Sequence, residues 1–211
     1  MPLSTWLIYF ATVLVVSATP GPNMLLAMTH GIRFGLRRTT PTLLGLLLAL
    51  ALIMGLSAAG LGALLVTSEW LFGLVKYAGA AYLLWLGIKT WRSQPQALAE
   101  GEADALAGSG WAGFRTGFLV AMSNPKAIVF FTALFPQFMD PAQPQGPQLL
   151  ILAATFFVIE TSWQCAYAAG GARLKAWLNS PRRLKLMNRV AGGSFIAAGV
   201  ALTRASSQAH A

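Results

Sequence analysis

The stretch from Ser17 to Met24 reads SATPGPNM and interrupts an apolar run that extends from Thr5 to Met28. Proline lacks a backbone N–H and clashes with the preceding helical turn, so two prolines flanking Gly21 cannot continue a regular helix. At membrane depth, the backbone groups that such a break frees are tolerated only inside protein or beside a water-filled cavity. We therefore expect a broken helix that faces the interior of a helical bundle.

A second break of the same kind lies near the middle of the apolar stretch Gly113–Phe135, where the chain reads Ser123-Asn124-Pro125-Lys126. Both breaks place an asparagine beside a proline, and an apolar half-helix follows each of them. A single break of this kind would indicate only a proline kink. Interrupted segments at corresponding positions of two halves point instead to the central site of a transporter.

The composition excludes a soluble globule. Of the 211 residues, 56% are hydrophobic and 10% are charged, whereas soluble domains carry about 25% charged residues. A membrane-spanning helix needs about 20 mostly apolar residues. Six stretches meet that requirement: Thr5–Met28, Pro41–Thr67, Trp70–Ile88, Gly113–Phe135, Gln148–Gly170 and Met187–Leu202.

The net charge of +9 is explained by topology rather than by nucleic acid. All but three of the 15 Lys and Arg residues fall in or beside the first, third and fifth connections, and the exceptions are Lys76, Lys126 and Arg204. Cytoplasmic loops of membrane proteins carry the excess of basic residues. The pattern predicts that both termini lie outside the cytoplasm.

We expect an all-α integral membrane protein whose six transmembrane helices form a 3+3 inverted repeat with broken helices 1 and 4. Three helices in each half force the two halves into opposite orientations. The whole chain, 1–211, is then one transmembrane domain, with repeat one at about 5–92, a linker at about 93–112 and repeat two at about 113–205.

Two ionisable residues lie near the centres of the expected spans, Lys126 in the fourth and Glu160 in the fifth. Such side chains are costly in the bilayer and mark substrate or proton pathways. Two structural alternatives stay open. Glu160 could be a protonated acid bonded to a neighbour, and Lys126 could neutralise Glu160 or cap carbonyls freed near Pro125. Lys76 lies nearer the outer end of its span, where it can reach the interface.

The motifs resemble the LysE/RhtB family of bacterial amino-acid exporters, with the nearest likeness to its homoserine, homoserine-lactone and threonine efflux branch. The resemblance is carried by Ser17–Met24, by Lys76–Gly87 (KYAGAAYLLWLG) with Trp91-Arg92, and by Asn124–Phe138 (NPKAIVFFTALFPQF). It implies export from the cytoplasm across the bacterial inner membrane, driven by the proton-motive force. The positions that it implies for the site are Pro20, Gly21, Pro22, Asn23, Asn124, Pro125, Lys126 and Glu160. One related branch carries an acid at the position of Asn23.

The residues suggest how a zwitterion would be held. The half-helix that begins at Pro22 and Asn23 directs N–H groups and its positive dipole end into the cavity. With Lys126, it could hold the substrate carboxylate. Glu160 could hold the ammonium group and also carry the coupling proton, which gives proton–substrate antiport.

Other functions fit the residues less well. The spans offer one acid and no histidine at depth, so we expect no enzyme, and we expect no cofactor and no metal site. A cation or metal-ion exporter of the same superfamily is the alternative, because asparagine oxygens could assist Glu160 with a hard cation. The expected partners are a small amino acid, protons and the lipid bilayer. Glycine-rich helix faces allow a homodimer, and the amino acid itself is left open.

Overall fold

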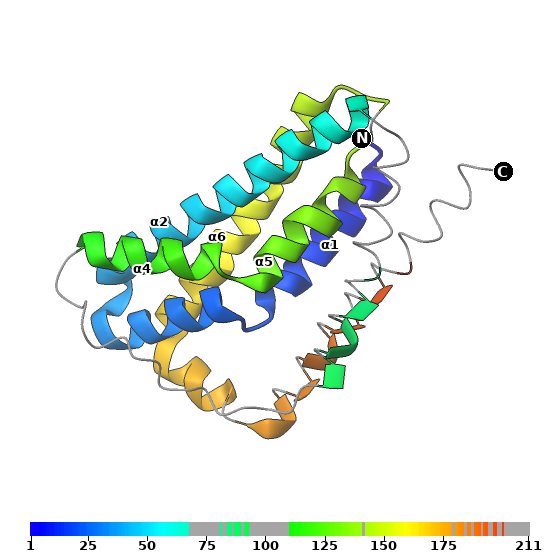
Figure 1. Ribbon diagram of the computed structural model, residues 1–211. Coiled ribbons are helices and arrows are strands. Elements are labelled where there is room, and N and C mark those ends of the chain that lie inside the picture. Colours follow the sequence, from blue (N-terminus) through cyan, green and yellow to red (C-terminus); the bar gives the residue numbers. More distant parts are fainter. Residues whose placement is uncertain are drawn as a thin grey trace.

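The computed structural model describes residues 1–67, 110–140 and 142–178, with scattered positions between 81 and 92 and between 180 and 200 (Figure 1). The assigned elements in these ranges are all helices, and no strand occurs among the described residues. They are α1 (Leu3–Ala18), α2 (Pro22–Thr67), α4 (Gly110–Met122), α5 (Pro125–Val129), the π-helix η1 (Phe130–Leu134), the 3₁₀-helix η2 (Phe135–Phe138) and α6 (Gln145–Leu178). The expected all-α architecture is thus confirmed for this part of the chain.

Both expected breaks are present. Helix α1 ends at Ala18, Thr19 takes an extended conformation, and α2 begins at Pro22. Helix α4 ends at Met122, and α5 begins at Pro125 after an extended Asn124. The α4 axis and the continuous α5–η1–η2 segment are bent by 54° at this point. Proline fits the first turn of a helix because its missing N–H has no intrahelical partner there.

Two further bends occur at glycines that the sequence did not single out. Gly35 has a φ of 74° inside α2, and Gly171 has a φ of 25° inside α6. Residues other than glycine rarely adopt this left-handed region. The half-helix after the first break therefore runs from Pro22 to Phe34, beyond the Met28 boundary that was expected, because Gly35 is what ends it.

Two described helices are long and apolar enough to cross a membrane, within Pro22–Gly60 and Gln145–Gly171. A third is obtained if the bent α4–η2 segment counts as one span. Helix α1 is apolar but has only 16 residues. The expected third and sixth spans, the linker and Lys76 lie wholly or largely outside the described residues. The count of six and the repeat boundaries therefore remain predictions from the sequence.

Glycines bring α2 and α4 into close contact. A Cβ on Gly117 would lie 2.2 Å from the carbonyl oxygen of Thr42, and one on Gly45 would lie 2.0 Å from that of Phe114. These distances are possible only without side chains, so small residues set the separation of the two backbones, as in other membrane helix pairs. The opposite face of α2 exposes Leu44, Leu48, Leu52 and Leu56, as expected for a surface that meets lipid.

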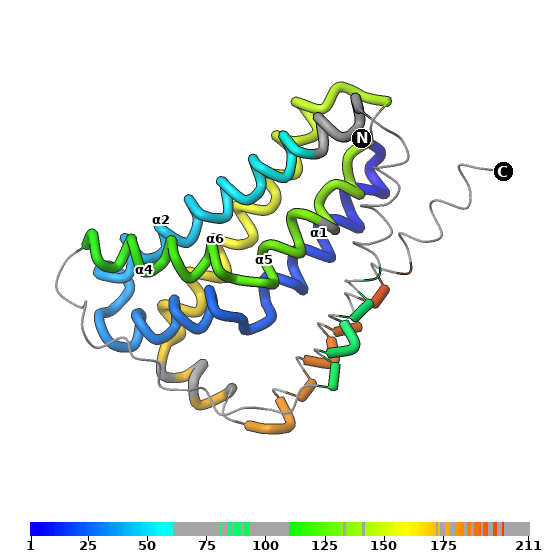
Figure 2. The backbone as a smooth tube through the Cα atoms, in the orientation of Figure 1, coloured from blue at the N-terminus to red at the C-terminus, as the bar shows by residue number. Residues whose placement is uncertain are grey.

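Helix α1 packs against both α6 and the segment after the second break. The Tyr9 ring lies 4.9 Å from that of Phe138, and its hydroxyl donates to the carbonyl of Leu152 at 3.1 Å. Figure 2 traces the path of the chain: α1 runs away from the N-terminus, the chain turns at the first break, and α2 turns again before running back toward the N-terminal end.

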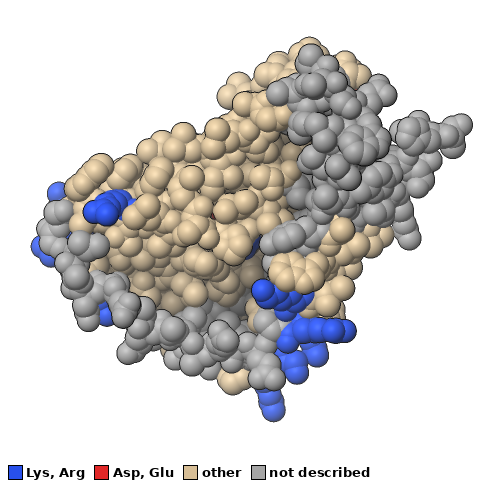
Figure 3. Space-filling view, viewed as in Figure 1, with Lys and Arg blue, Asp and Glu red and all other residues tan. Residues whose placement is uncertain are grey.

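The ends of the long helices differ in charge. On the face seen in Figure 3, the described Lys and Arg residues gather at the left and lower margins, and the described part of the upper region carries none. The N-terminus lies at the upper end, beside the loop between η2 and α6 (Figure 1). On this face, the described basic residues at these margins therefore lie away from the N-terminus.

Candidate functional site

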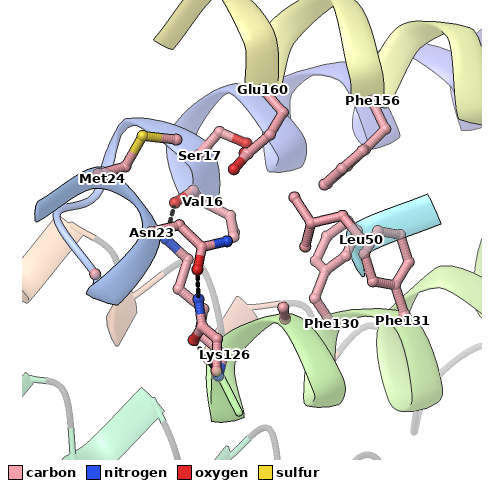
Figure 4. Close-up of a pocket in the computed structure, with 13 residues that line it drawn as sticks. Val16, Ser17, Asn23, Met24, Leu50, Lys126, Phe130, Phe131, Phe156 and Glu160 are labelled. Atoms are coloured by element: carbon pink, nitrogen blue, oxygen red, sulfur yellow. Dashed lines mark hydrogen bonds between the residues drawn. The ribbon is translucent and has the colours of Figure 1, made fainter. Parts of the chain in front are cut away.

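The two broken segments meet. The side-chain amide of Asn124 donates to the Asn23 side-chain oxygen at 2.9 Å, across 101 residues of sequence (Figure 4). Each side chain is only 4% exposed. The matched positions seen in the sequence are therefore in contact in space, and the two breaks share one centre.

Asn124 also begins the second half-helix. Its side-chain oxygen accepts the backbone N–H of Lys126 at 3.0 Å, which makes Asn124 the N-cap of α5. Asparagine is among the preferred N-caps because its side chain satisfies a donor that the helix leaves free. One side chain thus caps α5 and ties it to the start of α2.

Lys126 caps the end of α1. Its ammonium group donates to the carbonyl of Val16 and, at 3.0 Å, to that of Thr19. The hydroxyl of Tyr167 donates to the neighbouring carbonyl of Ala18 at 2.7 Å. The last carbonyls of a helix lack intrahelical partners, and a cation there also meets the negative end of the helix dipole. Lys126 therefore caps carbonyls, as one alternative allowed, but at the break around Pro20 rather than at Pro125.

Glu160 is buried on α6, with 5% exposure. Gln164, one turn further along, donates to its carboxylate at 3.3 Å. The Ser17 side chain hydrogen-bonds to the same group, and Lys126 interacts with it electrostatically. The hydrogen bonds of the Lys126 ammonium group go to α1 carbonyls rather than to Glu160. Glu160 and Lys126 therefore interact electrostatically, but their hydrogen bonds go to different groups.

Gln164 carries an unmet hydrogen-bonding group. It is fully buried, and its side-chain oxygen has no hydrogen-bond partner among the described residues. A buried acceptor without a donor is costly, and such sites usually bind a water molecule or a ligand. The polar cluster around Glu160 therefore has hydrogen-bonding capacity that the described residues do not use.

These groups surround a cavity at the meeting of the breaks (Figure 4). It measures about 370 Å³ with its open mouth included. Polar and charged side chains line one part and apolar side chains line the other. The lining residues are Val16, Ser17, Gly21, Asn23, Met24, Leu50, Asn124, Lys126, Ala127, Phe130, Phe131, Phe156 and Glu160.

Comparison with known proteins decides what kind of protein has this cavity. A family profile described as LysE type translocator matches residues 14–206, nearly the whole chain. This chain belongs to the LysE family of translocators.

Relatives of this LysE-type chain match it along almost their full length. A protein from Salmonella typhimurium named homoserine/homoserine lactone efflux protein is 37% identical over 97% of this chain and 98% of its own. A leucine efflux protein from Klebsiella pneumoniae is 31% identical over 90% and 91%. An uncharacterized membrane protein from Vibrio cholerae is 36% identical over 97% and 99%. No solved structure matches significantly.

In this LysE-family chain, five of the eight expected site residues line the cavity: Gly21, Asn23, Asn124, Lys126 and Glu160. Pro20, Pro22 and Pro125 are not among the lining residues, and they lie at or between the helix ends that form the breaks. Gly21 does not use a left-handed conformation, which among the described residues occurs only at Gly35 and Gly171. A methyl group at Gly21 would contact the Lys126 side chain at 3.6 Å.

Sequence reasoning missed several residues of the LysE-family site. Ser17 lies inside the quoted motif, and Gln164 follows Glu160 by one helical turn, so their spacing could have indicated them. The apolar lining formed by Leu50, Phe130, Phe131 and Phe156 carries no such signal. Trp163, one turn from Glu160, packs near Tyr167 with ring centres 6.4 Å apart, and it is not among the lining residues.

Proposed function

We propose that this LysE-family translocator exports small neutral amino acids or their derivatives, of the homoserine and threonine type, from the cytoplasm by proton antiport. The observation that carries the proposal is a buried carboxylate in a cavity where two broken helices meet. An ionisable group at such depth is retained where it binds a substrate or carries a proton.

The relatives support the substrate class. Two of them are named for efflux of homoserine, its lactone or leucine, and both of these amino acids have uncharged side chains. Each of these free amino acids is a zwitterion with an ammonium group and a carboxylate. The cavity offers an acid and hydrogen-bonding amides over a short distance, which suits such a molecule.

Glu160 is the proposed proton-coupling residue. When it is ionised and open to the cytoplasm, its carboxylate binds the substrate ammonium group. When the cavity opens outward, a proton from outside neutralises Glu160, and the ammonium group loses its counter-charge and leaves. Return to the inward state releases the proton to the cytoplasm. Ser17 and Gln164 orient the carboxylate through both steps by their hydrogen bonds.

The substrate carboxylate is proposed to bind beside Asn23 and Asn124, at the start of α2. The N-terminus of a helix attracts anions through its free N–H groups and dipole. Lys126 contributes positive potential from its position at the end of α1. Pro20, Gly21, Pro22 and Pro125 keep the helix ends apart and so preserve the cavity.

The cation or metal-ion exporter is the alternative that the sequence left open. No group of three or more His, Cys, Asp or Glu side chains converges among the described residues. Hard cations prefer several oxygen ligands, commonly carboxylates. No observation therefore favours this function over amino-acid export.

Transport by purified protein in liposomes tests the proposal. A pH gradient is imposed across the liposome membrane, and outward transport of labelled substrate is followed. The labelled compounds are homoserine, threonine, leucine, lysine and homoserine lactone. The wild-type protein should move a small neutral amino acid against its gradient. Glu160→Gln should lose this pH-driven accumulation by at least about tenfold, while exchange of labelled for unlabelled substrate continues, because the amide cannot carry the proton.

Asp140→Asn is the matched control, since Asp140 lies in the loop before α6 and makes a local bond to the N–H of Ala142. It should retain coupling. Coupling that persists in Glu160→Gln would place the proton carrier elsewhere. If no amino acid moves and a divalent cation does, the cation exporter replaces the proposal.

A further inference from the structure

The apolar part of the cavity is an aromatic cluster from two elements. The rings of Phe131 and Phe156 have centroids 4.8 Å apart, those of Phe130 and Phe131 are 5.2 Å apart, and those of Phe130 and Phe156 are 5.6 Å apart. Leu50 of α2 packs beside them (Figure 4). We call these four side chains the aromatic wall.

The side chains of the aromatic wall are almost fully buried. Phe130, Phe131 and Phe156 are 2%, 0% and 4% exposed, and Leu50 is 2% exposed. The polar side chains of Glu160 and Asn23 lie at the other part of the cavity (Figure 4), and Asn124 is hydrogen-bonded to Asn23. A charged group pushed against the wall would lose its water without gaining a partner, which is strongly unfavourable.

Local structure holds the wall in place. Phe130 and Phe131 begin the π-helix η1, a rare helical form that is frequent at functional sites. The hydroxyl of Ser57 in α2 donates to the backbone carbonyl of Phe131 and so ties η1 to α2. Phe156 is held by the continuous part of α6. The wall is therefore anchored at α2, η1 and α6 together.

The wall stands at a fixed distance from the acid. Phe156 and Glu160 are four residues apart on α6, and side chains with that spacing share a helix face with Cβ atoms about 5–6 Å apart. A substrate whose ammonium group is bound at Glu160 therefore has room for only a short side chain before it meets the Phe156 ring.

We propose that the aromatic wall formed by Leu50, Phe130, Phe131 and Phe156 contacts the substrate side chain and limits it to a short, uncharged one. This inference rests on the proposed function, because it assumes that the cavity binds an amino acid. It predicts that homoserine and threonine are accepted, that leucine is a poorer substrate and that lysine is excluded.

Wall variants test the inference by competition. Counterflow of labelled homoserine in proteoliposomes is inhibited by unlabelled threonine, leucine or lysine. Phe156→Leu and Leu50→Val each remove volume from the wall. Each should improve inhibition by leucine relative to threonine by about tenfold, since one or two methylene groups in an apolar pocket change discrimination by that order. Lysine should remain a poor inhibitor, because the enlarged wall is still apolar.

Phe118→Leu is the matched control. Phe118 of α4 is partly buried outside the cavity lining and its ring lies beside that of Phe114, so its substitution should leave the leucine to threonine ratio unchanged. Size-exclusion profiles and substrate-dependent thermal shifts check that each variant is folded. If Phe156→Leu fails to fold, Leu50→Val carries the test alone.

The outcomes separate the two proposals. If the wild-type protein neither transports nor binds any amino acid, the proposed function is wrong. If it transports homoserine but folded wall variants keep the wild-type ratio within about twofold, the wall does not contact the side chain. Lysine competing as well as threonine in the wild type would likewise overturn the inference.

Discussion

Lys126 is the residue at which structure and function must be separated by experiment. Its hydrogen bonds to Val16 and Thr19 show that it closes the end of α1, whereas the proposed transport cycle uses only its potential. A lysine that only bound substrate could be replaced by a neutral residue without loss of stability. A lysine that caps a helix cannot be replaced in this way, because the buried carbonyl groups would then lack a hydrogen-bond donor.

We expect Lys126→Met to lower the free energy of unfolding by at least about 1 kcal/mol, the order of cost of an unsatisfied buried polar group. Thermal unfolding in detergent measures this without substrate. Lys89→Met is the control, since Lys89 is exposed and its ammonium group lies over the Trp85 ring at 4.8 Å. A loss of transport in Lys126→Met with unchanged stability would show that the cap is energetically unimportant.

Individual residues could be predicted where their chemistry was unusual for their surroundings. Glu160 and Lys126 stood out because charge inside an apolar run is rare. Their partners could not be predicted, because the carbonyls of Val16 and Thr19 lie more than 100 residues from Lys126 in sequence. Gln164 and Ser17 are ordinary polar residues until the fold places them beside the acid.

At the scale of helices, contact between α2 and α4 depends on missing side chains. We expect Gly117→Ala to destabilise the protein by about 1–3 kcal/mol, the usual cost of overpacking. The new methyl group would lie 2.2 Å from the backbone oxygen of Thr42, so the two helices must move apart. Helix propensity alone would favour alanine by about 1 kcal/mol, which makes the sign of the result informative.

Gly55→Ala provides the comparison within the same helix pair. A Cβ there meets nothing within 4 Å, so this variant keeps the gain in propensity and avoids the clash. Thermal unfolding of both variants in detergent gives the packing cost as their difference. Equal or higher stability of Gly117→Ala would mean that α2 and α4 do not approach as closely as described.

The breaks were the predictable part of the helical architecture, because proline acts through local sterics. Pro22 and Pro125 begin helices where the sequence placed them. The bend at Gly35 was not predicted, since an isolated glycine is tolerated in many helices and only its φ reveals the turn. The π-helix at Phe130–Leu134 was missed for a similar reason: its residues are equally suited to an α-helix.

At the scale of the whole molecule, the inverted repeat was inferred from two similar motifs in the two halves. The hydrogen bond between Asn23 and Asn124 supports a common centre. The third helix of each half falls largely outside the described residues, so the full symmetry remains a prediction. The orientation of the chain in the membrane is also a prediction from the sequence, and it can be tested directly.

We expect both termini and the loop between η2 and α6 to lie outside the cytoplasm, and the bend at Gly35 to lie inside. Basic residues Arg33, Arg37 and Arg38 flank that bend, and cytoplasmic loops carry such excess. In Figure 1 the N-terminus and the loop before α6 lie together at the other end. Cys165 is the chain's single cysteine, so Cys165→Ser gives a background without thiols.

Two single-cysteine variants on that background decide the orientation, Gln143→Cys in the loop and Arg38→Cys near the bend, both at exposed positions. A membrane-impermeant maleimide added to intact spheroplasts should label Gln143→Cys and leave Arg38→Cys unlabelled. Permeabilised cells should give labelling of both, which shows that each thiol is accessible. The reverse labelling pattern would mean that the protein has the opposite orientation in the membrane. Glu160 would then have to take its proton through the basic end, and the direction of the proposed antiport would need to be derived again.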